Sequence, residues 1–347
     1  MVMDIFYNAS LAGRNTFGMK VKAACLVDYY SIEELVEALG NVGLPRPFFH
    51  IGGGSNILLM NDFPGTVLHS CIRFIDHTRL ESGVSVRAGA GVPWDDFCLW
   101  CAERGLWGPE NLSMIPGEVG AAAVQNIGAY GREVCEIIST VECFDTEQHT
   151  MVALRPEECA YGYRDSIFKN GGKGRYIVTA VSFNLREEYS PELGYGNVLE
   201  AVTRSCGQFA VHEHMLTPSQ VRSVIVNIRS GKLPDPVKVG SAGSFFRNPV
   251  VPAEKYGQLA RDFGETVPHY DLGGGKVKIP AAWLIDRCGW KGYRGANAGV
   301  WDSQPLVIVN ATGNASPQEI KDLEDRIRAS VLEKFGIELM PEVEHVS

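Results

Sequence analysis

Apolar residues recur at helical spacing in a few segments of the chain. In residues 221–228, four apolar positions follow one another at i, i+3, i+4 and i+7, directly after a capping box that starts at Thr217. Further capping boxes start at Ser31 and Ser316, and the helix after Ser316 is expected to end at Gly336. The pattern therefore predicts amphipathic helices that each pack one face against a core.

Short apolar runs of β-type composition separate these helices. They fall at residues 48–51, 57–60, 66–69, 84–88, 140–144, 175–185 and 306–310. Strands and helices mix without a regular βαβα order, so the pattern favours an α+β fold over a doubly wound sheet. Two prolines in Lys232-Leu-Pro-Asp-Pro236 follow a helix and predict a domain boundary. The stretch 337–343 is expected to form a strand that returns to the first part of the chain.

Length and charge narrow the classes of protein that this chain can be. Its 347 residues correspond to two or three domains. No apolar run reaches the roughly 18–20 residues of a membrane span, and residues 1–4 do not begin a secretory signal. The net charge of −9 argues against a general nucleic-acid binder, which needs a basic face. We therefore expect a cytoplasmic protein without a membrane or nucleic-acid partner, in which a local basic pocket for a small anion is still compatible with the charge.

The cysteines and histidines give little sign of redox or metal chemistry. Nine cysteines are scattered along the chain, which is typical of reduced cytoplasmic thiols. Cys98 and Cys101 have redox spacing, but they fall on one apolar face of a predicted helix over residues 93–105, so we expect them to be core residues. His212 and His214 have no third ligand in view and are expected on the surface. We predict no metal site.

The first concentration of glycines lies between two predicted strands. The segment contains Gly52, Gly53, Gly54, Ser55 and Asn56. A dinucleotide fingerprint is excluded, because no helix follows and the glycine spacing differs. Several backbone N–H groups can converge here on an anion such as a pyrophosphate, and the two polar side chains can add donors. A plain hairpin turn is the alternative.

A second concentration of small residues runs from Ile115 to Gly131 and includes three consecutive alanines. Small residues let a flat ligand lie against the main chain, and the amide side chains can bind ring heteroatoms. The alternative, a small-residue helix that packs closely on a neighbour, fits residues 119–124 but not the segment that follows. The candidate ligand contacts here are Pro116, Gly117, Gly120, Gln125, Asn126, Gly128, Ala129, Tyr130 and Gly131.

These loops belong to a set of nine short motifs that occur in a fixed order. The motifs are Asn15-Thr-Phe-Gly18, Gly53-Gly-Ser-Asn56, Ile115-Pro-Gly117, Gln125-Asn-Ile-Gly-Ala-Tyr-Gly131, Tyr163-Arg-Asp-Ser166, Lys232-Leu-Pro-Asp-Pro236, Ala242-Gly-Ser-Phe-Phe-Arg-Asn-Pro249, Trp283-Leu-Ile-Asp286 and Pro341-Glu-Val343. Together they resemble the family of UDP-N-acetylenolpyruvoylglucosamine reductases, over nearly the whole chain.

The resemblance implies an architecture and a reaction. The expected fold is α+β, with an FAD-binding domain of the p-cresol-methylhydroxylase type and a C-terminal substrate-binding domain. The two flavin subdomains are expected at residues 1–70 and 71–233. The substrate-binding domain is expected at residues 234–347, with a C-terminal strand that returns to the active site. The implied cofactor is FAD and the implied co-substrate is NADPH. The implied substrate, UDP-N-acetylglucosamine enolpyruvate, is reduced to UDP-N-acetylmuramate for peptidoglycan.

Three residues match the family's catalytic positions. Arg164 matches the residue that stabilises the enolate, and a guanidinium suits a carboxylate because it is planar and always charged. Glu342 matches a second stabiliser, which must be protonated or must orient a donor. Ser244 matches the proton donor, and a dry site next to Phe245 and Phe246 would favour that role. Taken alone, each residue also fits a structural role.

Five further residues match positions that bind substrate. Lys is a suitable point charge for a diphosphate. In one branch of the family, a loop that bears a tyrosine closes over the nucleotide, and Gly194-Tyr195-Gly196 has the form of such a loop with glycine hinges. The resemblance therefore places the chain in the longer, loop-containing branch. The candidate substrate contacts are Tyr195, Lys232, Asn248, Lys291 and Gln304.

Three positions depart from common family patterns. Glu118 stands where a small polar residue is frequent, and we expect its side chain to point away from the pyrophosphate, which it would repel. Ala123 stands where proline is frequent. Glu344 stands where an arginine can occur, so a ligand contact there is in doubt.

Two other functions stay open at this point. One is a flavin-dependent alcohol or sugar oxidase of the same flavin fold, for which His50 is the nearest residue to a covalent flavin link. The other is a nucleotide-sugar-binding protein without catalysis. We expect small-molecule ligands and a monomer.

Overall fold

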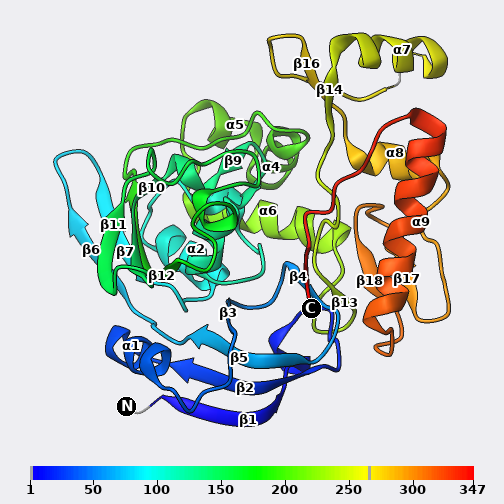
Figure 1. Ribbon diagram of the computed structural model, residues 1–347. Coiled ribbons are helices and arrows are strands. Elements are labelled where there is room, and N and C mark those ends of the chain that lie inside the picture. Colours follow the sequence, from blue (N-terminus) through cyan, green and yellow to red (C-terminus); the bar gives the residue numbers. More distant parts are fainter. Residues whose placement is uncertain (1–2, 265–266) are drawn as a thin grey trace. The chain divides into compact units, whose positions relative to one another are not determined.

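The computed structural model describes residues 3–264 and 267–347 and shows an α+β protein (Figure 1). Contacts divide the chain into two compact units. The first unit contains the N-terminal residues up to Ala9, then Ala23–Gly53 and Phe63–Arg229. The second contains Ser10–Lys22, Gly54–Asp62 and Ser230–Ser347. The chain thus passes from the first unit to the second between Gly53 and Gly54, inside the first glycine-rich segment. The three-part division expected above stays a prediction.

The first unit begins with a four-stranded sheet. The strand order is β1 (Asp4–Ser10), β2 (Lys22–Tyr29), β5 (Phe63–Ser70) and β3 (Phe48–Ile51), and β5 runs parallel to both of its neighbours. Apolar residues of this sheet and of α1 (Ile32–Gly40) share one buried cluster. The Ser31 hydroxyl caps α1, but the Glu34 carboxylate accepts from the N–H of Tyr30 rather than from that of Ser31. The capping box predicted there is therefore only half formed.

A five-stranded antiparallel sheet forms the larger core of the first unit. Its strands, in spatial order, are β11 (Thr150–Leu154), β10 (Ile138–Asp145), β12 (Tyr176–Leu185), β7 (Val84–Gly89) and β6 (Ile75–Arg79). Two helices, α2 (Trp94–Glu103) and α3 (Val119–Gln125), add to the same core, where the rings of Phe97 and Phe183 lie 4.6 Å apart.

The thiols of Cys98 and Cys101 confirm their prediction as core residues. Both side chains of α2 are fully buried and neither forms a disulfide. Burial raises the pKa of each thiol far above the ordinary value, so the reactive thiolate is disfavoured.

Three helices complete the first unit around a separate apolar cluster. They are α4 (Val198–Cys206), α5 (Gln208–His212) and α6 (Pro218–Lys232), of which α6 ends in the second unit. The capping box at Thr217 is complete, because its N–H and hydroxyl exchange hydrogen bonds with Gln220.

His212 and His214 lie on the surface, as expected: both are exposed, and the ring of His214 stacks on Tyr189 with centroids 4.7 Å apart. A short ladder, β8 (Gly128–Ala129) with β9 (Arg132–Glu133), lies after α3.

The second unit contains two three-stranded sheets and the longest helix among the described residues. One sheet has the order β13 (Gly240–Ser241), β18 (Ile308–Asn310), β17 (Ala298–Val300), and the other β14 (Val250–Pro252), β16 (Lys276–Lys278), β15 (Tyr270–Asp271). The remaining helices are α7 (Ala253–Phe263), α8 (Ala281–Arg287) and α9 (Pro317–Phe335). As predicted, α9 starts at a complete capping box on Ser316 and ends at Gly336 in the left-handed conformation.

The C-terminal strand differs from its predicted position. It is β19 (Glu344–Val346), which pairs in parallel with β4 (Ile57–Leu59). The stretch 337–343 is not a strand, because its main chain is bonded to side chains and loops rather than to a continuous neighbour. The strand does return to an early part of the chain, but that part belongs to the second unit. Within residues 3–264 and 267–347, the helices are all too short or too polar to cross a membrane.

Candidate active site

The first glycine-rich segment connects β3 to β4 and is restrained by close backbone contacts. Gly54 has φ +62°, and a Cβ on it would lie 2.0 Å from the carbonyl oxygen of Arg14. The carbonyl of Gly54 also accepts a hydrogen bond of 3.1 Å from the N–H of Thr16. Only glycine fits this position, so the segment is held against the loop that contains Arg14 and Thr16.

The preceding two glycines face the second small-residue segment. A Cβ on Gly53 would lie 3.2 Å from the Cα of Gly117, and a Cβ on Gly52 would lie 3.0 Å from the Cβ of Ala121. Gly53 is exposed, although its main chain packs this closely. The two segments thus meet closely at small residues. We call this junction the cradle, and a side chain at either glycine would crowd it.

The end of α3 is fixed by Asn126. This residue has φ +46° and is fully buried. Its side-chain amide donates to the Glu133 carboxylate at 3.0 Å and to the Gly162 carbonyl at 2.8 Å, and its oxygen accepts from the N–H of Cys135. The expected bond from this side chain to a ring heteroatom is therefore corrected: both amide hydrogens already have partners inside the protein.

Arg164 lies against the same loop. It adopts φ +56°, and its guanidinium donates to the carbonyls of Asn126, at 3.2 Å, and of Gly128. A Cβ on Gly128 would lie 2.9 Å from the backbone carbonyl oxygen of Arg132 and 2.7 Å from the guanidinium, so a side chain there would force the loop to shift. Lys169 joins two predicted site residues, because its ammonium donates to the Gln125 side chain at 2.6 Å and to the Arg164 carbonyl at 3.1 Å. A left-handed backbone at a non-glycine residue is typical of functional sites.

The loop that carries Tyr195 packs on the loop after α3. The rings of Tyr130 and Tyr195 meet edge to face with centroids 6.4 Å apart. The buried amide of Asn111 donates to the carbonyls of Tyr130 and Glu192, at 2.9 and 2.8 Å, and so ties the two loops together. Tyr195 itself is about two-fifths exposed (39%).

Two residues of this region were missed from the sequence. One is Asn111, which lies between Glu110 and Leu112 in a segment without a distinctive pattern. The other is Arg229, on α6, whose guanidinium contacts Tyr130. Burial raises the pKa of Tyr130, and the charge and hydrogen bond of Arg229 oppose that effect. A basic residue on the face of an amphipathic helix is an unspecific signal, so sequence patterns do not single out Arg229.

In the second unit, the backbone brings Ser244 and Glu342 together. Phe246 and Pro341 form an antiparallel bridge, and the N–H of Glu342 donates to the Phe245 carbonyl at 2.8 Å. Ser244 immediately precedes this pair. Phe245 and Phe246 are buried beneath the segment, while Ser244 and Glu342 are partly accessible.

Asn56 joins the first glycine-rich segment to Glu342. Its side-chain amide donates to the Glu342 carbonyl at 3.2 Å, and its own carbonyl accepts from the N–H of Glu344 at 3.0 Å. Helix α9 holds the chain before this point, because Arg328 donates to the Leu339 carbonyl at 3.0 Å. Predicted residues from distant parts of the sequence therefore meet in the second unit, whereas Arg164 lies in the first.

The expected substrate contacts lie on separate elements of the second unit, apart from Tyr195. Lys232 and Lys291 are exposed, and Gln304 is partly buried in the turn before β18. The side-chain oxygen of Asn248 accepts from the N–H of Ala281 at 2.9 Å and so caps α8.

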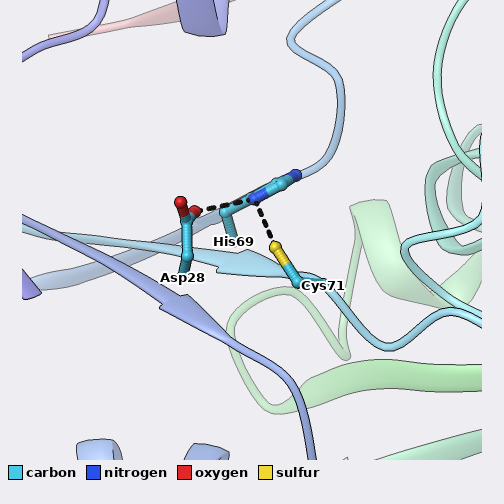
Figure 2. Close-up of side chains that lie close together, drawn as sticks. All are labelled: Asp28, His69 and Cys71. Carbon is cyan, nitrogen blue, oxygen red and sulfur yellow. Dashed lines mark hydrogen bonds and ion pairs between the residues drawn. The ribbon is translucent and has the colours of Figure 1, made fainter. Parts of the chain in front are cut away.

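A cluster of titratable side chains lies beside the cradle in the first unit. The His69 Nδ1–H donates to Asp28 at 2.8 Å, and the Cys71 sulfur is 3.5 Å from the same nitrogen (Figure 2). The other nitrogen of His69 lies 2.9 Å from the Glu118 carboxylate. In the part of the chain that the structure describes, Asp28, His69 and Cys71 are a group whose donor atoms lie as close as those of a metal site. Both imidazole nitrogens of His69 are hydrogen-bonded to carboxylates, so we assign no metal to this group.

Comparison with known proteins decides the family. Residues 235–346 match the family described as UDP-N-acetylenolpyruvoylglucosamine reductase, C-terminal domain, and residues 23–153 match the FAD binding domain family. The UDP-N-acetylenolpyruvoylglucosamine reductase of Bacteroides fragilis (strain YCH46) is 45% identical over 338 residues, covering 97% of this chain and 98% of the relative. The chain belongs to the UDP-N-acetylenolpyruvoylglucosamine reductase family.

Other members of this reductase family agree in length and fold. The Neisseria gonorrhoeae reductase is 41% identical over 344 residues, covering 98% of this chain and 97% of its own. The crystal structure of the Thermus caldophilus reductase has a TM-score of 0.67 and 25% identity, with full coverage of both chains. The expected α+β architecture, a flavin domain plus a C-terminal domain of this reductase family, is confirmed, and so is FAD as the cofactor.

The cradle is compatible with FAD. A side chain on Gly52 or Gly53 would crowd the second small-residue segment, and both segments lie within the matched FAD-binding region. His50 is the residue that kept the oxidase alternative open, and its ring is hydrogen-bonded to Tyr29. Its Nε2 lies 2.6 Å from the Tyr29 hydroxyl, and burial together with the charge of His69 lowers the pKa of His50 to about 4.

Proposed function

We propose that this chain reduces UDP-N-acetylglucosamine enolpyruvate to UDP-N-acetylmuramate with NADPH, in peptidoglycan precursor synthesis, and that Arg164, Ser244 and Glu342 carry the chemistry. Membership of the reductase family supports the reaction. The single structural observation that carries the residue assignment is the backbone pairing of Phe245 with Glu342, which sets Ser244 beside Glu342. FAD, when bound, passes hydride from NADPH to the enolpyruvyl group.

The flavin is held by the two small-residue segments. In this proposal, Gly52, Gly53 and Gly54 approach the pyrophosphate with their main chain, and Ser55 and Asn56 extend the contact. The remaining contacts come from the second segment. They are Pro116, Gly117, Gly120, Gln125, Ala129, Tyr130 and Gly131. Asn126 and Gly128 shape this loop through their bonds to Glu133, Gly162 and Arg164.

Arg164 binds the carboxylate of the substrate and stabilises the negative charge that develops there. Its guanidinium is positioned by two loop carbonyls, so little reorganisation is needed at the moment of reaction. Ser244 donates the proton to the carbon next to the carboxylate, over the buried rings of Phe245 and Phe246, which exclude water. Glu342 is held in place through its backbone and is the second stabilising group. Its carboxyl group either donates a hydrogen bond in its protonated form or orients another hydrogen-bond donor.

The nucleotide part of the substrate needs positive charge and a cover. We assign the diphosphate to Lys232 and Lys291, with Asn248 and Gln304 as hydrogen-bonding partners. Tyr195, between two glycines and partly exposed, is assigned as the cover. We further propose that the protein is a cytoplasmic monomer, which the acidic charge and the pattern of free cysteines favour.

Stopped-flow absorbance of the flavin tests the proposed function. Mixing with NADPH should bleach the bound flavin, and UDP-N-acetylglucosamine enolpyruvate should then restore its absorbance in a second mixing step. A flavin that an alcohol or sugar reduces and dioxygen reoxidises, without reduction by NADPH, would identify an oxidase and overturn the proposal. A protein that binds the nucleotide sugar without any flavin turnover would identify a binding protein instead.

A further inference from the structure

Glu118 has an unusual position next to the flavin cradle. It lies at the N-terminal boundary of α3, yet its side chain makes no capping bond to the helix. One carboxylate oxygen lies 2.9 Å from His69 Nε2, and the other lies 3.2 Å from the place that a Cβ on Gly52 would take. A carboxylate is thus buried directly against one of the glycines that we assign to the pyrophosphate.

His69 provides the positive charge in this cluster. Its side chain is 6% exposed, and those of Asp28 and Glu118 are 8% and 9% exposed. Burial by itself lowers the pKa of His69, but the hydrogen bonds to Asp28 and Glu118 and their charges outweigh it and raise the pKa to about 9. At neutral pH the ring is therefore an imidazolium that donates one hydrogen bond to each carboxylate.

The surrounding titratable groups do not replace that charge. They are Asp28 and Tyr29 on β2, His50 on β3, Cys71 after β5, and Glu118 before α3. His50 is neutral at pH 7 because burial and the charge of His69 lower its pKa to about 4. Tyr29 and Cys71 are never cationic. Without the His69 proton, two buried carboxylates would face each other across the ring, one of them against Gly52.

We propose that His69 is a positioning residue of the flavin site: by its hydrogen bond it holds and neutralises the Glu118 carboxylate, so that this carboxylate does not repel the FAD pyrophosphate at the Gly52–Gly53 cradle. The inference rests on the proposed placement of the pyrophosphate. It explains how this chain tolerates an acidic residue at position 118. A buried carboxylate is stable only when it is paired, and removal of the partner leaves an uncompensated charge.

A double-mutant cycle on the purified holoenzyme tests the inference. The variants are His69→Gln, Glu118→Gln and the double variant, and the readout is the FAD dissociation constant from the rise of flavin fluorescence on dilution. We expect His69→Gln to weaken FAD binding by roughly tenfold or more at pH 7, because the Glu118 charge is then uncompensated. Glu118→Gln should bind FAD at least as tightly as the wild type, and the double variant should return to within about threefold of it.

The pH profile separates this role from a merely structural one. Wild-type FAD affinity should fall as the pH rises through about 9, where the His69 proton is lost, and Glu118→Gln should not show this fall. The buried neutral histidine His50 is the matched control, because His50→Gln changes no charge at pH 7 and should leave the pH profile unchanged.

Four results would overturn the inference. If the double variant binds FAD as weakly as His69→Gln does, the role of His69 is structural. If the wild type contains stoichiometric zinc that His69→Gln lacks, the cluster is a metal site. If Gly53→Ala weakens FAD binding while His69→Gln does not, the pyrophosphate does bind at the cradle, but His69 is not needed to neutralise Glu118. If Gly53→Ala also binds FAD normally, the pyrophosphate lies elsewhere and both proposals fall.

Discussion

The side-chain amide of Asn56 donates a 3.2 Å hydrogen bond to the backbone carbonyl of Glu342, a residue 286 positions later in the chain. The parallel pairing of β4 with β19 begins at Ile57, directly after Asn56, and at Glu344, two residues after Glu342. Asn56, a predicted flavin-loop residue, and Glu342, a predicted catalytic residue, are thus joined by this hydrogen bond at the start of the β4–β19 pairing. We infer that the loop and the C-terminal segment are positioned together rather than independently.

Asn56→Ala should lower both the stability of the protein and the rate at which the substrate reoxidises the flavin. Loss of one partly buried hydrogen bond should lower the free energy of unfolding by about 1 kcal/mol, measured by urea denaturation. Because Glu342 loses a support, substrate-dependent reoxidation of the flavin should slow by roughly tenfold. The exposed variant Asn314→Ala is the control. Normal reoxidation in Asn56→Ala, with only weaker FAD binding, would show that Asn56 does not position Glu342.

Ser244→Ala should separate the two half-reactions. Flavin reduction by NADPH should keep its rate, because no proton from Ser244 is needed there. Reoxidation by UDP-N-acetylglucosamine enolpyruvate should slow by about 10²–10⁴-fold, the usual contribution of a general acid. Stopped-flow absorbance measures both rates, and the exposed Ser303→Ala serves as the control. Equal slowing of both half-reactions would contradict the role of proton donor.

Gly53→Ala should weaken FAD binding because its Cβ would lie 3.2 Å from the Cα of Gly117, inside the cradle. We expect the FAD dissociation constant to rise by roughly tenfold, since the main chain can no longer approach the ligand. Gly171→Ala is a matched control, because a Cβ there meets no atom within 4 Å and its φ is not positive. Equal FAD affinity in the two variants would move the pyrophosphate away from this cradle.

Local signals in the sequence were sufficient for much of the fold. Helix α9 begins and ends at its predicted residues, because a capping box and a C-terminal glycine act within a few positions of the helix ends. The C-terminal strand was placed seven residues too early, at 337 instead of Glu344. Ile337, Leu339 and Val343 are buried although the stretch forms no continuous strand; its main chain bonds to Arg328 of α9 and to the segment around Phe245. Composition does not distinguish such a stretch from a strand.

The site was less accessible to prediction, because side-chain direction depends on residues far away in sequence. Asn126 stands in a loop rich in glycine, where an amide can face a ligand or the backbone, and its two donors turn out to bind Glu133 and Gly162. Glu118 and His69 are 49 residues apart, and nothing in either neighbourhood indicates their pairing. Ser244 and Glu342 were selected through a resemblance, and the backbone pairing supplied the physical reason for their proximity.

Tyr195→Ala should weaken nucleotide binding more than FAD binding. The ring packs edge to face on Tyr130 and is partly exposed, so it is available to cover a ligand. We expect the KM values for NADPH and the UDP-sugar to rise roughly tenfold, and the FAD dissociation constant to change by less than about threefold. Tyr195→Phe keeps the ring but removes the hydroxyl, so it shows how much of the effect comes from the hydroxyl alone. A larger effect on FAD than on the nucleotides would assign Tyr195 to the flavin site instead.

The charge state of His69 should make the stability of the protein depend on pH. Its pKa is raised from 6.5 to about 9, because hydrogen bonds to Asp28 and Glu118 outweigh the effect of burial. A group whose pKa rises on folding stabilises fully below its unfolded pKa, and this contribution is lost as the pH rises through the folded pKa. The free energy of unfolding of the wild type, relative to His69→Gln, should therefore fall by on the order of 3 kcal/mol between about pH 6 and pH 9.5. Urea denaturation at several pH values measures this difference. A difference that stays constant, or that grows with pH, would mean that His69 is neutral in the folded protein.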